Sequence, residues 1–313
     1  LLMANNKLAT KQAGQALAGA LAVNSVLKEL DLSANYWRYS RSEEGDGVGF
    51  AKQLAVGLSA NGALENLHIG NNDIPVENMN KIIAIVEAKP AMKILCAVPF
   101  RDKTITELDV SGKSLGVEGA LVIRRYLENN GALTSLNVSD NRMATKEAGK
   151  ALADALGANS VLKELNVSSN SWDDWGGTKG DGPGFAKELS VGISANGALV
   201  KLLMGANGFK GIEAGKALGD AIALNTVLKE LDISGGQYTS QKCDAAFIKG
   251  FSPGLGANGA LFLTKSKKKV PASNFDEMPE HTDGKGLKGK LAKYEGREVS
   301  IVKSSKKGQQ LSI

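Results

Sequence analysis

The sequence predicts an α/β fold, a curved solenoid of right-handed βα units whose parallel sheet lines the concave side, followed by a small β-rich C-terminal segment. The main observation is a segment matching L-x-x-L-x-L-x-x-N at residues 27–35, 64–72, 133–141, 162–170 and 199–207, with weaker copies from Met92, Ile105, Leu228 and Leu261 and a remnant at Leu1. Most copies begin 28, 29 or 37 residues apart, which leaves room for one helix in each unit. A longer period of 135 residues relates residues 1–72 to 136–207 and indicates duplication of a larger unit.

Each copy is expected to form one strand, in which alternate side chains face opposite sides. In the copy at residues 162–170, Leu165 and Val167 point into the core and the residues beside them point outward. The Asn that ends the motif is expected to point inward and to hydrogen-bond loop backbone, so that successive copies form a ladder. Lys113 and Gly236 stand where this Asn is expected and interrupt the ladder.

A helix is expected after each strand. In residues 145–156, Thr145 is the expected N-cap, and the helix carries an apolar stripe of Ala148, Ala151, Leu152, Ala155 and Leu156. The helices are expected to end at Asn-Gly or Asn-Ser pairs, which lie at residues 61–62, 130–131, 159–160, 196–197 and 258–259. Residues 91–103 lack a helix pattern, so we expect the arc to kink or flatten there.

These features together resemble the leucine-rich-repeat proteins of the ribonuclease-inhibitor type. Residues 149–170 carry the combination in full: helix leucines, an Asn turn and the L-x-x-L-x-L-x-x-N strand. The family includes the inhibitor itself, the repeat regions of nucleotide-binding receptors and activators of the Ran GTPase. The resemblance covers about residues 1–264, and it implies a βα horseshoe that holds protein partners on its concave face and loops.

Three segments are predicted along the chain: a leucine-rich-repeat solenoid over residues 1–264, a linker over 265–286, and a short β-rich segment over 287–313. The last segment reads as strands at 290–294, 297–303 and 309–313, which resemble part of an SH3-like barrel. Residues 262–313 carry 12 Lys/Arg against 6 Asp/Glu, whereas residues 1–261 carry 26 against 27. The basic character therefore belongs to the tail, and a short lysine cluster there is a weak argument for nucleic-acid binding.

The bulk composition favours an intracellular, cytoplasmic protein. Cys96 and Cys243 are the only cysteines, far fewer than disulfide-stapled secreted domains use. No apolar run approaches the length needed to span a bilayer. The chain opens at Leu1, inside a repeat, which indicates a cropped or processed N-terminus and is compatible with a removed targeting segment.

The outward-facing strand positions are the first candidate binding surface. Neighbouring copies align these positions into columns that are rich in acidic and small residues. The candidate partner-binding residues on this concave face are Glu29, Asp31, His68, Glu107, Asp109, Glu164, Asn166, Glu230 and Asp232. Such a face is expected to attract a basic segment of a protein partner. The alternative is that these strands simply carry solvated polar residues.

The inserted loops after two equivalent strands are the second candidate surface. All three tryptophans fall in these loops, and aromatic and Arg side chains on loops often dominate interfaces. The candidate loop residues are Tyr36, Trp37, Arg38, Trp172 and Trp175. The alternative is that the rings cover the edge of the solenoid.

No catalytic or cofactor site is expected. His68 and His281 are the only histidines, and neither lies at metal-ligand spacing from Cys or acidic residues. The acids Asp173, Asp174 and Asp181 fit no calcium loop, and no nucleophile-elbow, Walker or dinucleotide-binding motif occurs. We therefore expect no enzyme, no metal, no cofactor and no small-molecule substrate.

The predicted function is a protein-interaction module or scaffold. Two alternatives remain: a permanent structural subunit of a larger assembly, and a GTPase-activating protein that would need a loop Arg such as Arg38. The sequence does not identify the partner.

Overall fold

The computed structural model describes residues 1–36, 38–40, 43–172, 180–236 and 241–258, together with short strands at 270–271, 289–294, 297–301, 303–305 and 308–311. For residues 38–40, 43–44 and the strands after residue 269, the description is limited to the backbone.

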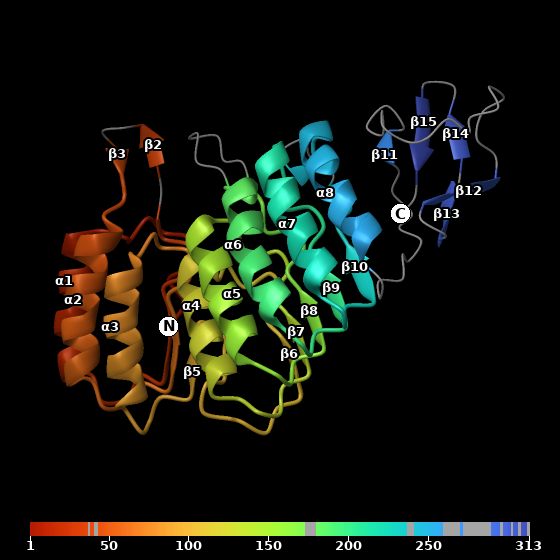
Figure 1. The fold of residues 1–313 in the computed structure, drawn as a ribbon. Coiled ribbons are helices and arrows are strands. Elements are labelled where there is room, and N and C mark those ends of the chain that lie inside the picture. Colours follow the sequence, from red (N-terminus) through yellow and green to blue (C-terminus); the bar gives the residue numbers. More distant parts are fainter. Residues whose placement is uncertain are drawn as a thin grey trace.

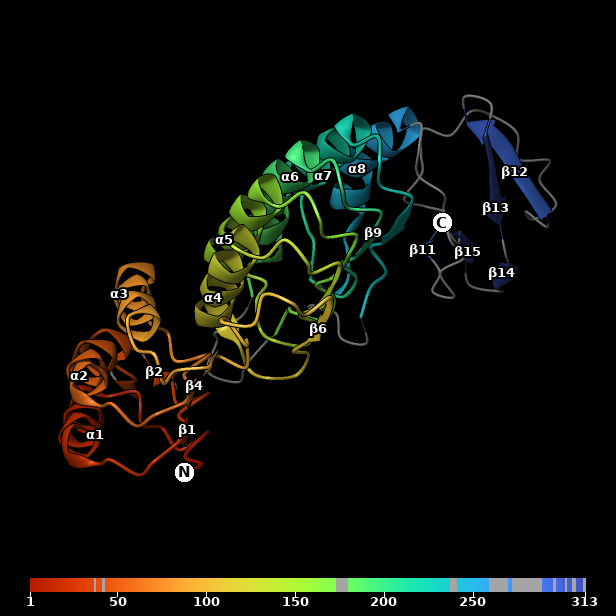
Figure 2. The same cartoon turned by 90° about the horizontal axis from the view of Figure 1, so that it is seen from below.

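Helices alternate with strands along the solenoid, as Figure 1 shows. The helices are α1 (Lys11–Val23), α2 (Gly47–Ala60), α3 (Val76–Glu87), α4 (Gly116–Glu128), α5 (Lys146–Ala158), α6 (Gly182–Ala195), α7 (Ile212–Leu224) and α8 (Ala245–Ala257). The repeat strands are β1 (Glu29–Asp31), β4 (Asn66–His68), β5 (Ile94–Leu95), β6 (Glu107–Asp109), β7 (Ser135–Asn137), β8 (Glu164–Asn166), β9 (Lys201–Leu203) and β10 (Glu230–Asp232). A small hairpin, β2 (Arg38–Ser40) with β3 (Glu43–Glu44), follows β1. Seen from below in Figure 2, the helices line the outer side of an arc and the strands the inner side.

The repeat leucines align as the sequence predicts. The parallel pairs place Leu30 opposite Leu67, and Leu136 opposite Leu165, and each of these side chains is at most 2% exposed. The predicted N-cap is also confirmed, because Thr145 Oγ1 accepts a hydrogen bond from Ala148 N at 3.1 Å. The arrangement is therefore an α/β solenoid with one βα unit in each regular repeat.

The predicted asparagine ladder is present in the loops that follow β1, β4, β7, β8 and β9. Asn170 illustrates one rung: its Nδ2 donates to Val167 O at 2.8 Å and to Val138 O at 3.1 Å. Its Oδ1 accepts from Asn141 N and Met143 N of the preceding repeat. Equivalent rungs are Asn35, Asn72, Asn141 and Asn207. Each rung pairs buried backbone groups of two repeats, which would otherwise cost free energy to bury.

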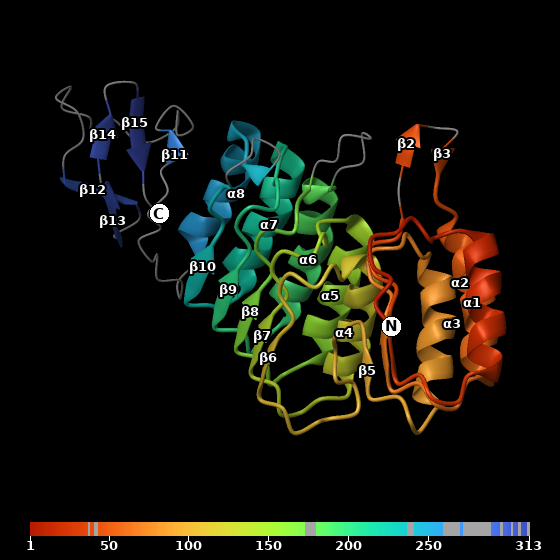
Figure 3. The ribbon, with the colours of Figure 1, turned by 180° about the vertical axis from the view of Figure 1, so that it is seen from behind.

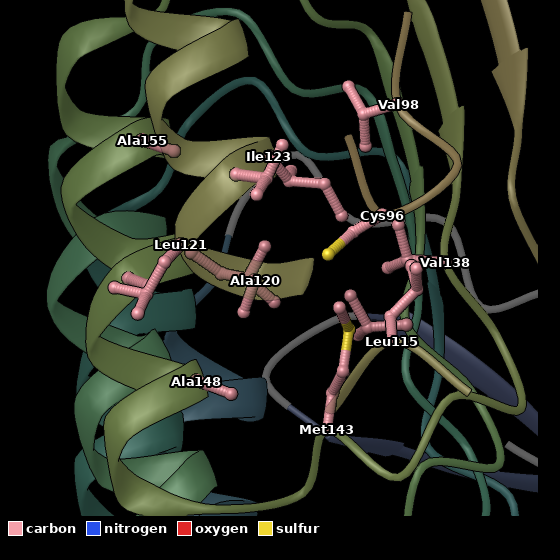
Figure 4. Close-up of a cluster of buried hydrophobic side chains, with 14 of the residues drawn as sticks. Cys96, Val98, Leu115, Ala120, Leu121, Ile123, Val138, Met143, Ala148 and Ala155 are labelled. Atoms are coloured by element: carbon pink, nitrogen blue, oxygen red, sulfur yellow. The ribbon is translucent and has the colours of Figure 1, made fainter. Parts of the chain in front are cut away.

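The arc is interrupted at residues 91–103, where the sequence predicts a repeat without a helix. The structure confirms that no helix lies there, and it separates the parallel strands into two sheets, β1-β4-β5 and β6 to β10. Figure 3 shows the second sheet from behind, with β6 to β10 side by side. The hydrophobic core nevertheless continues across the interruption, since Cys96 and Val98 lie beside Ile123 of α4 in Figure 4.

Glu118 supplies the ladder rung that is missing at this interruption. As predicted, Lys113 contributes no rung. Instead Glu118, in the first turn of α4 and 1% exposed, reaches back to the preceding repeat. Its Oε1 accepts from Asn72 N and Ile74 N, both at 2.9 Å, and its Oε2 accepts from Asn71 N at 3.0 Å. In a regular repeat, the backbone N–H groups at these loop positions donate to an Asn side chain, as Asn141 N and Met143 N donate to Asn170 Oδ1. At the interruption a carboxyl group takes the place of that amide.

A second asparagine ladder runs along the ends of the helices. All of these residues except Asn225 were predicted to end helices and turn the chain, and they also bind the preceding repeat. Asn196 Nδ2 donates to Leu156 O and Asn159 O, while its Oδ1 accepts from Leu199 N. Asn61, Asn159, Asn225 and Asn258 repeat this pattern of donation. Asn130 differs, because its Nδ2 has no hydrogen-bond partner among the described residues. The repeat before Asn130 is the one that has no helix, so no helix-end carbonyls are presented to it.

Small residues bring neighbouring helices close together. A Cβ added to Gly57 would lie 2.4 Å from Ala18 Cα of α1, and one added to Gly192 would lie 2.5 Å from Ala153 Cα of α5. Both atoms belong to the neighbouring backbone, which has no rotamer change available to relieve the contact.

We expect Gly192→Ala to lower the free energy of unfolding by about 2 kcal/mol, because the added methyl forces α5 and α6 apart. The matched control is Gly157→Ala in α5, where an added Cβ meets nothing within 4 Å. That change is expected to be neutral or to stabilise by about 0.5–1 kcal/mol, since alanine favours helix. Urea denaturation of both variants checks the pair, and equal effects would contradict the close-packing argument.

The C-terminal segment contains short antiparallel strands. These are β11 (Val270–Pro271), β12 (Gly289–Tyr294), β13 (Arg297–Ile301), β14 (Lys303–Ser305) and β15 (Gly308–Leu311). β12 pairs with β13, and β15 pairs with β14 and β11. The predicted strands at 290–294, 297–303 and 309–313 fall on these elements, with the second divided into β13 and β14. The SH3-like interpretation and the domain boundaries stay predictions, and the predicted copy from Leu261 and His281 lie outside the described residues.

Candidate binding surface on the concave face

The predicted concave residues lie on the repeat strands in register. Within the first sheet, Glu29 is opposite Asn66 and Asp31 is opposite His68. Within the second sheet, one column of outward positions contains Glu107, Ser135, Glu164, Lys201 and Glu230, and the other contains Asp109, Asn137, Asn166, Leu203 and Asp232. The structure therefore brings these residues together in columns, as the sequence predicts, but in two groups.

The columns are not continuous from one end to the other. β5 lies beside β4 with Ile94 opposite Asn66, so an apolar side chain occupies the first column at the end of the first sheet. β6, which carries Glu107 and Asp109, begins the second sheet. Alignment of motif copies by sequence alone places β4 next to β6 in the columns, because β5 is only a weak copy of the motif.

The second column has a local structural role as well as an outward position. Asp31 Oδ1 accepts from Ser33 N at 2.8 Å, and Asp232 Oδ1 accepts from Ser234 N at 2.7 Å. Asp109, Asn137 and Asn166 make the same bond to the residue two positions on. Such turns explain why Asp and Asn alternate freely here, since both side chains offer the required oxygen. This bond uses one oxygen of each aspartate, and the negative charge remains on the concave face.

Positive side chains offset only part of this acidity. In the two columns the basic side chain is Lys201, whose Nζ lies 3.7 Å from Glu230 Oε2. Asn66 Nδ2 donates to Glu29 Oε1 at 2.8 Å, and Asn137 Nδ2 donates to Asp109 Oδ2 at 3.1 Å. Hydrogen bonds from Ser111 and Asn137 hold the pKa of Asp109 below its usual value. The columns therefore carry more acidic than basic side chains, and the face is acidic.

His68 is a poor general base. Burial lowers its pKa, while the Asp31 charge and the backbone at Lys113 oppose that change. Its Nδ1 is buried without a hydrogen-bond partner among the described residues. The neutral ring contributes no charge to the acidic columns beside it.

The predicted loop residues are only partly described. Tyr36 is half-buried and packs against the hydrophobic core, which favours the interpretation that this ring covers the edge of the solenoid. Trp172 is also half-buried, and its carbonyl accepts from Gly180 N at 3.0 Å. Trp37 and Trp175 lie outside the described residues, and Arg38 is described only as backbone in β2. The binding role of the loops stays a prediction.

The two cysteines and Asp181 have environments that indicate a structural role and no reaction. Burial raises the pKa of Cys96 and of Cys243 to about 12, so neither thiol is an activated nucleophile. Asp181 is the N-cap of α6, and its Oδ1 accepts from Gly184 N at 2.8 Å. Within the described residues, no three His, Cys, Asp or Glu side chains are grouped to hold a metal ion. No helix of that same part of the chain is long and apolar enough to cross a membrane.

One cavity was missed by the sequence interpretation. It measures about 330 Å³ and lies between α3 and α4, where the helix is missing from the repeat. The sequence feature that could have indicated this cavity is the 13-residue spacing between the copies at Met92 and Ile105. This spacing leaves no room for a helix, so the helices on either side lack their usual neighbour.

The strand register, the inward leucines and the asparagine ladder define the class of protein: the chain is a leucine-rich-repeat solenoid. No protein-family model matches it. Among solved structures it is similar to a tropomodulin C-terminal domain from Caenorhabditis elegans, with a TM-score of 0.37 and 15% identity over 50% of this chain and 86% of that chain. It is also similar to leiomodin-1 actin-binding site 2, with a TM-score of 0.34 and 16% identity over 49% of this chain and 83% of that chain.

Proposed function

We propose that the chain is a protein-interaction module or scaffold whose acidic concave face binds a basic segment of a partner protein. The observation that carries this proposal is that the aligned columns of β6 to β10 hold five carboxyl side chains and one basic one. The five are Glu107, Asp109, Glu164, Glu230 and Asp232. Facing charges of opposite sign speed the encounter of two proteins and select against partners of the same charge.

The proposal includes the ribonuclease-inhibitor type of repeat, a cytoplasmic location and a role without catalysis. The type is supported by helices of 13 residues in repeats of 29 residues, as in α5 and α7. The non-catalytic role is supported by the raised pKa of both thiols and by the local hydrogen bonds that occupy the concave aspartates.

The concave face is tested by neutralising its aspartates while keeping their turns. The triple variant Asp31→Asn, Asp109→Asn and Asp232→Asn retains the side-chain oxygen that Asn137 and Asn166 use at the same position. We expect it to bind a fluorescent peptide of alternating Lys and Ser roughly tenfold more weakly than wild type at low salt, and to differ less at high salt. Fluorescence anisotropy measures both affinities.

The matched control removes the same number of charges from the helices, by Glu77→Gln, Glu147→Gln and Glu213→Gln. These residues lie exposed in the first turns of α3, α5 and α7. Equal peptide affinity in wild type and the aspartate variant, or an equal loss in the control, would remove the concave face from the proposal.

A further inference from the structure

The cavity between α3 and α4 lies where the repeat at residues 91–103 would have its helix. In a regular stretch such as α4-β7-α5, one strand separates successive helices along the chain, whereas two strands, β5 and β6, separate α3 from α4 with no helix between them. The cavity is lined on the α3 side by Ile83 and Val86 and on the α4 side by Val122 and Tyr126, with Leu95 also lining it. A volume of about 330 Å³ is larger than one bulky side chain requires, and the apolar residues give it a surface that favours another apolar group.

Basic side chains surround this apolar surface. Arg101, Lys103 and Arg125 line the cavity, with Glu87 as the acidic residue among the lining residues. The cavity is therefore surrounded by net positive charge, which is opposite to the charge of the concave columns.

Two of the three cations are engaged by the protein itself. Arg101 Nη2 donates to Glu87 O at the end of α3, at 3.0 Å, and its Nε donates to Met92 O in the following turn, at 2.6 Å. The first of these bonds satisfies a carbonyl that a helix C-terminus leaves unpaired. Arg125 Nε and Nη2 donate to the two carboxylate oxygens of Glu87, at 2.7 and 3.3 Å. Neither guanidinium needs an external anion.

Lys103 is the cation whose charge has no carboxylate in contact among the described residues. Its Nζ lies 4.6 Å from the centroid of the Tyr126 ring. The Tyr126 hydroxyl donates to Asp102 O at 2.8 Å, which holds the ring in place beneath the ammonium. Partial burial lowers the pKa of Lys103, and the Glu87 charge opposes this change. An ammonium carries three hydrogen-bond donors, and the aromatic face satisfies none of them fully.

We propose that this cavity is a second docking site, which accepts an apolar side chain of a partner protein whose neighbouring Asp or Glu carboxylate pairs with Lys103. The apolar lining receives the side chain, and the cation beside it selects an acidic segment over a basic one. The site goes beyond the concave face, since it lies between helices and prefers the opposite charge. A protein with both sites can hold a basic segment and an acidic one at the same time.

The proposal is tested with an array of blocked peptides in which one Leu or Phe is flanked by Glu at different positions. Parallel peptides carry Gln or Lys in place of Glu. Wild type is expected to bind the best Glu peptides about tenfold more tightly than their Gln counterparts. Lys103→Glu is expected to abolish that preference, whereas Lys52→Glu, an exposed substitution on α2, is expected to preserve it. Circular dichroism confirms that both variants fold.

The outcomes separate this site from the concave face. Loss of Glu-peptide binding in Lys103→Glu with unchanged Lys/Ser-peptide binding supports the second site. Equal binding of Glu peptides by Lys103→Glu and wild type overturns it, as does the absence of any Glu preference. Concentration-dependent self-association of wild type that Lys103→Glu removes, without peptide binding, would mean that a second copy occupies the cavity, and would also overturn the proposal.

Discussion

Glu118→Ala is expected to lower the free energy of unfolding by about 4 kcal/mol at pH 5, because it leaves three backbone N–H groups without an acceptor. Those groups belong to Asn71, Asn72 and Ile74, in the loop that precedes α3. The matched control is Glu147→Ala, which removes an exposed carboxylate from the first turn of α5. It is expected to cost less than about 1 kcal/mol, the usual contribution of an acidic residue to the helix dipole. Chemical denaturation monitored by circular dichroism measures both.

The effect of Glu118 should also depend on pH. Burial raises the pKa of this carboxyl from 4.5 to about 7, and the backbone N–H groups that it accepts from oppose the rise. The folded protein therefore binds the proton more tightly than the unfolded chain does. The resulting stabilisation is fully present below about pH 4.5 and is lost as the pH rises through 7.

Glu118→Gln removes this titration and serves as the reference. Between pH 4.5 and 7, the unfolding free energy of wild type is expected to fall by up to about 3 kcal/mol relative to that of Glu118→Gln. Denaturation curves at closely spaced pH values provide the measurement. A difference that stays constant over this range would show that folding does not raise the pKa of this carboxyl.

Asn159→Ala is expected to destabilise the protein by about 3 kcal/mol, and Asn130→Ala by only about 1 kcal/mol. Both side chains accept hydrogen bonds from the loop that follows their helix, at Leu162 N for Asn159 and Leu133 N for Asn130. Asn159 Nδ2 also donates to Leu127 O and Asn130 O, whereas Asn130 Nδ2 has no partner among the described residues. The difference between the two variants therefore measures the bonds between repeats.

Denaturation midpoints give the two losses, and amide hydrogen exchange locates them. Exchange in Asn159→Ala should increase at the ends of α4 and α5, because the missing side chain joins these two helix ends. Equal losses for Asn159→Ala and Asn130→Ala would indicate that the donated bonds contribute nothing to stability, and that these residues act only as turns.

Features that depend on the spacing of residues along the chain could be predicted from the sequence. The inward positions of Leu165 and Val167 follow from the alternation of side chains in a strand, and the Thr145 cap from its place before an apolar stripe. The ladder asparagines were predictable for the same reason, since every copy ends with the same local turn.

Features that depend on contacts between distant segments could not be predicted in the same way. Glu118 reads in the sequence as an ordinary first-turn glutamate, and its acceptor role appears only when α4 lies against residues 44 to 47 positions earlier. The helix-end asparagines read as turn residues, and their donation to the preceding repeat depends on how closely the helices stack. Ile94 was absent from the predicted columns because β5 is a weak copy of the motif. Lys103 was overlooked because a missing helix, rather than a motif, creates its surroundings.

The division of the parallel strands after β5 has a consequence for how the protein comes apart. In a stack where each repeat touches only its neighbours, unfolding begins at the junction with the weakest coupling between adjacent units. Here that junction lacks one helix and one helix-end rung, and the Glu118 carboxyl is its ladder connection. The segment from β1 to β5 should therefore detach from the longer β6 to β10 segment before either melts. The protein would then populate an intermediate with an intact β6 to β10 segment at pH above 7, where that carboxyl is ionised.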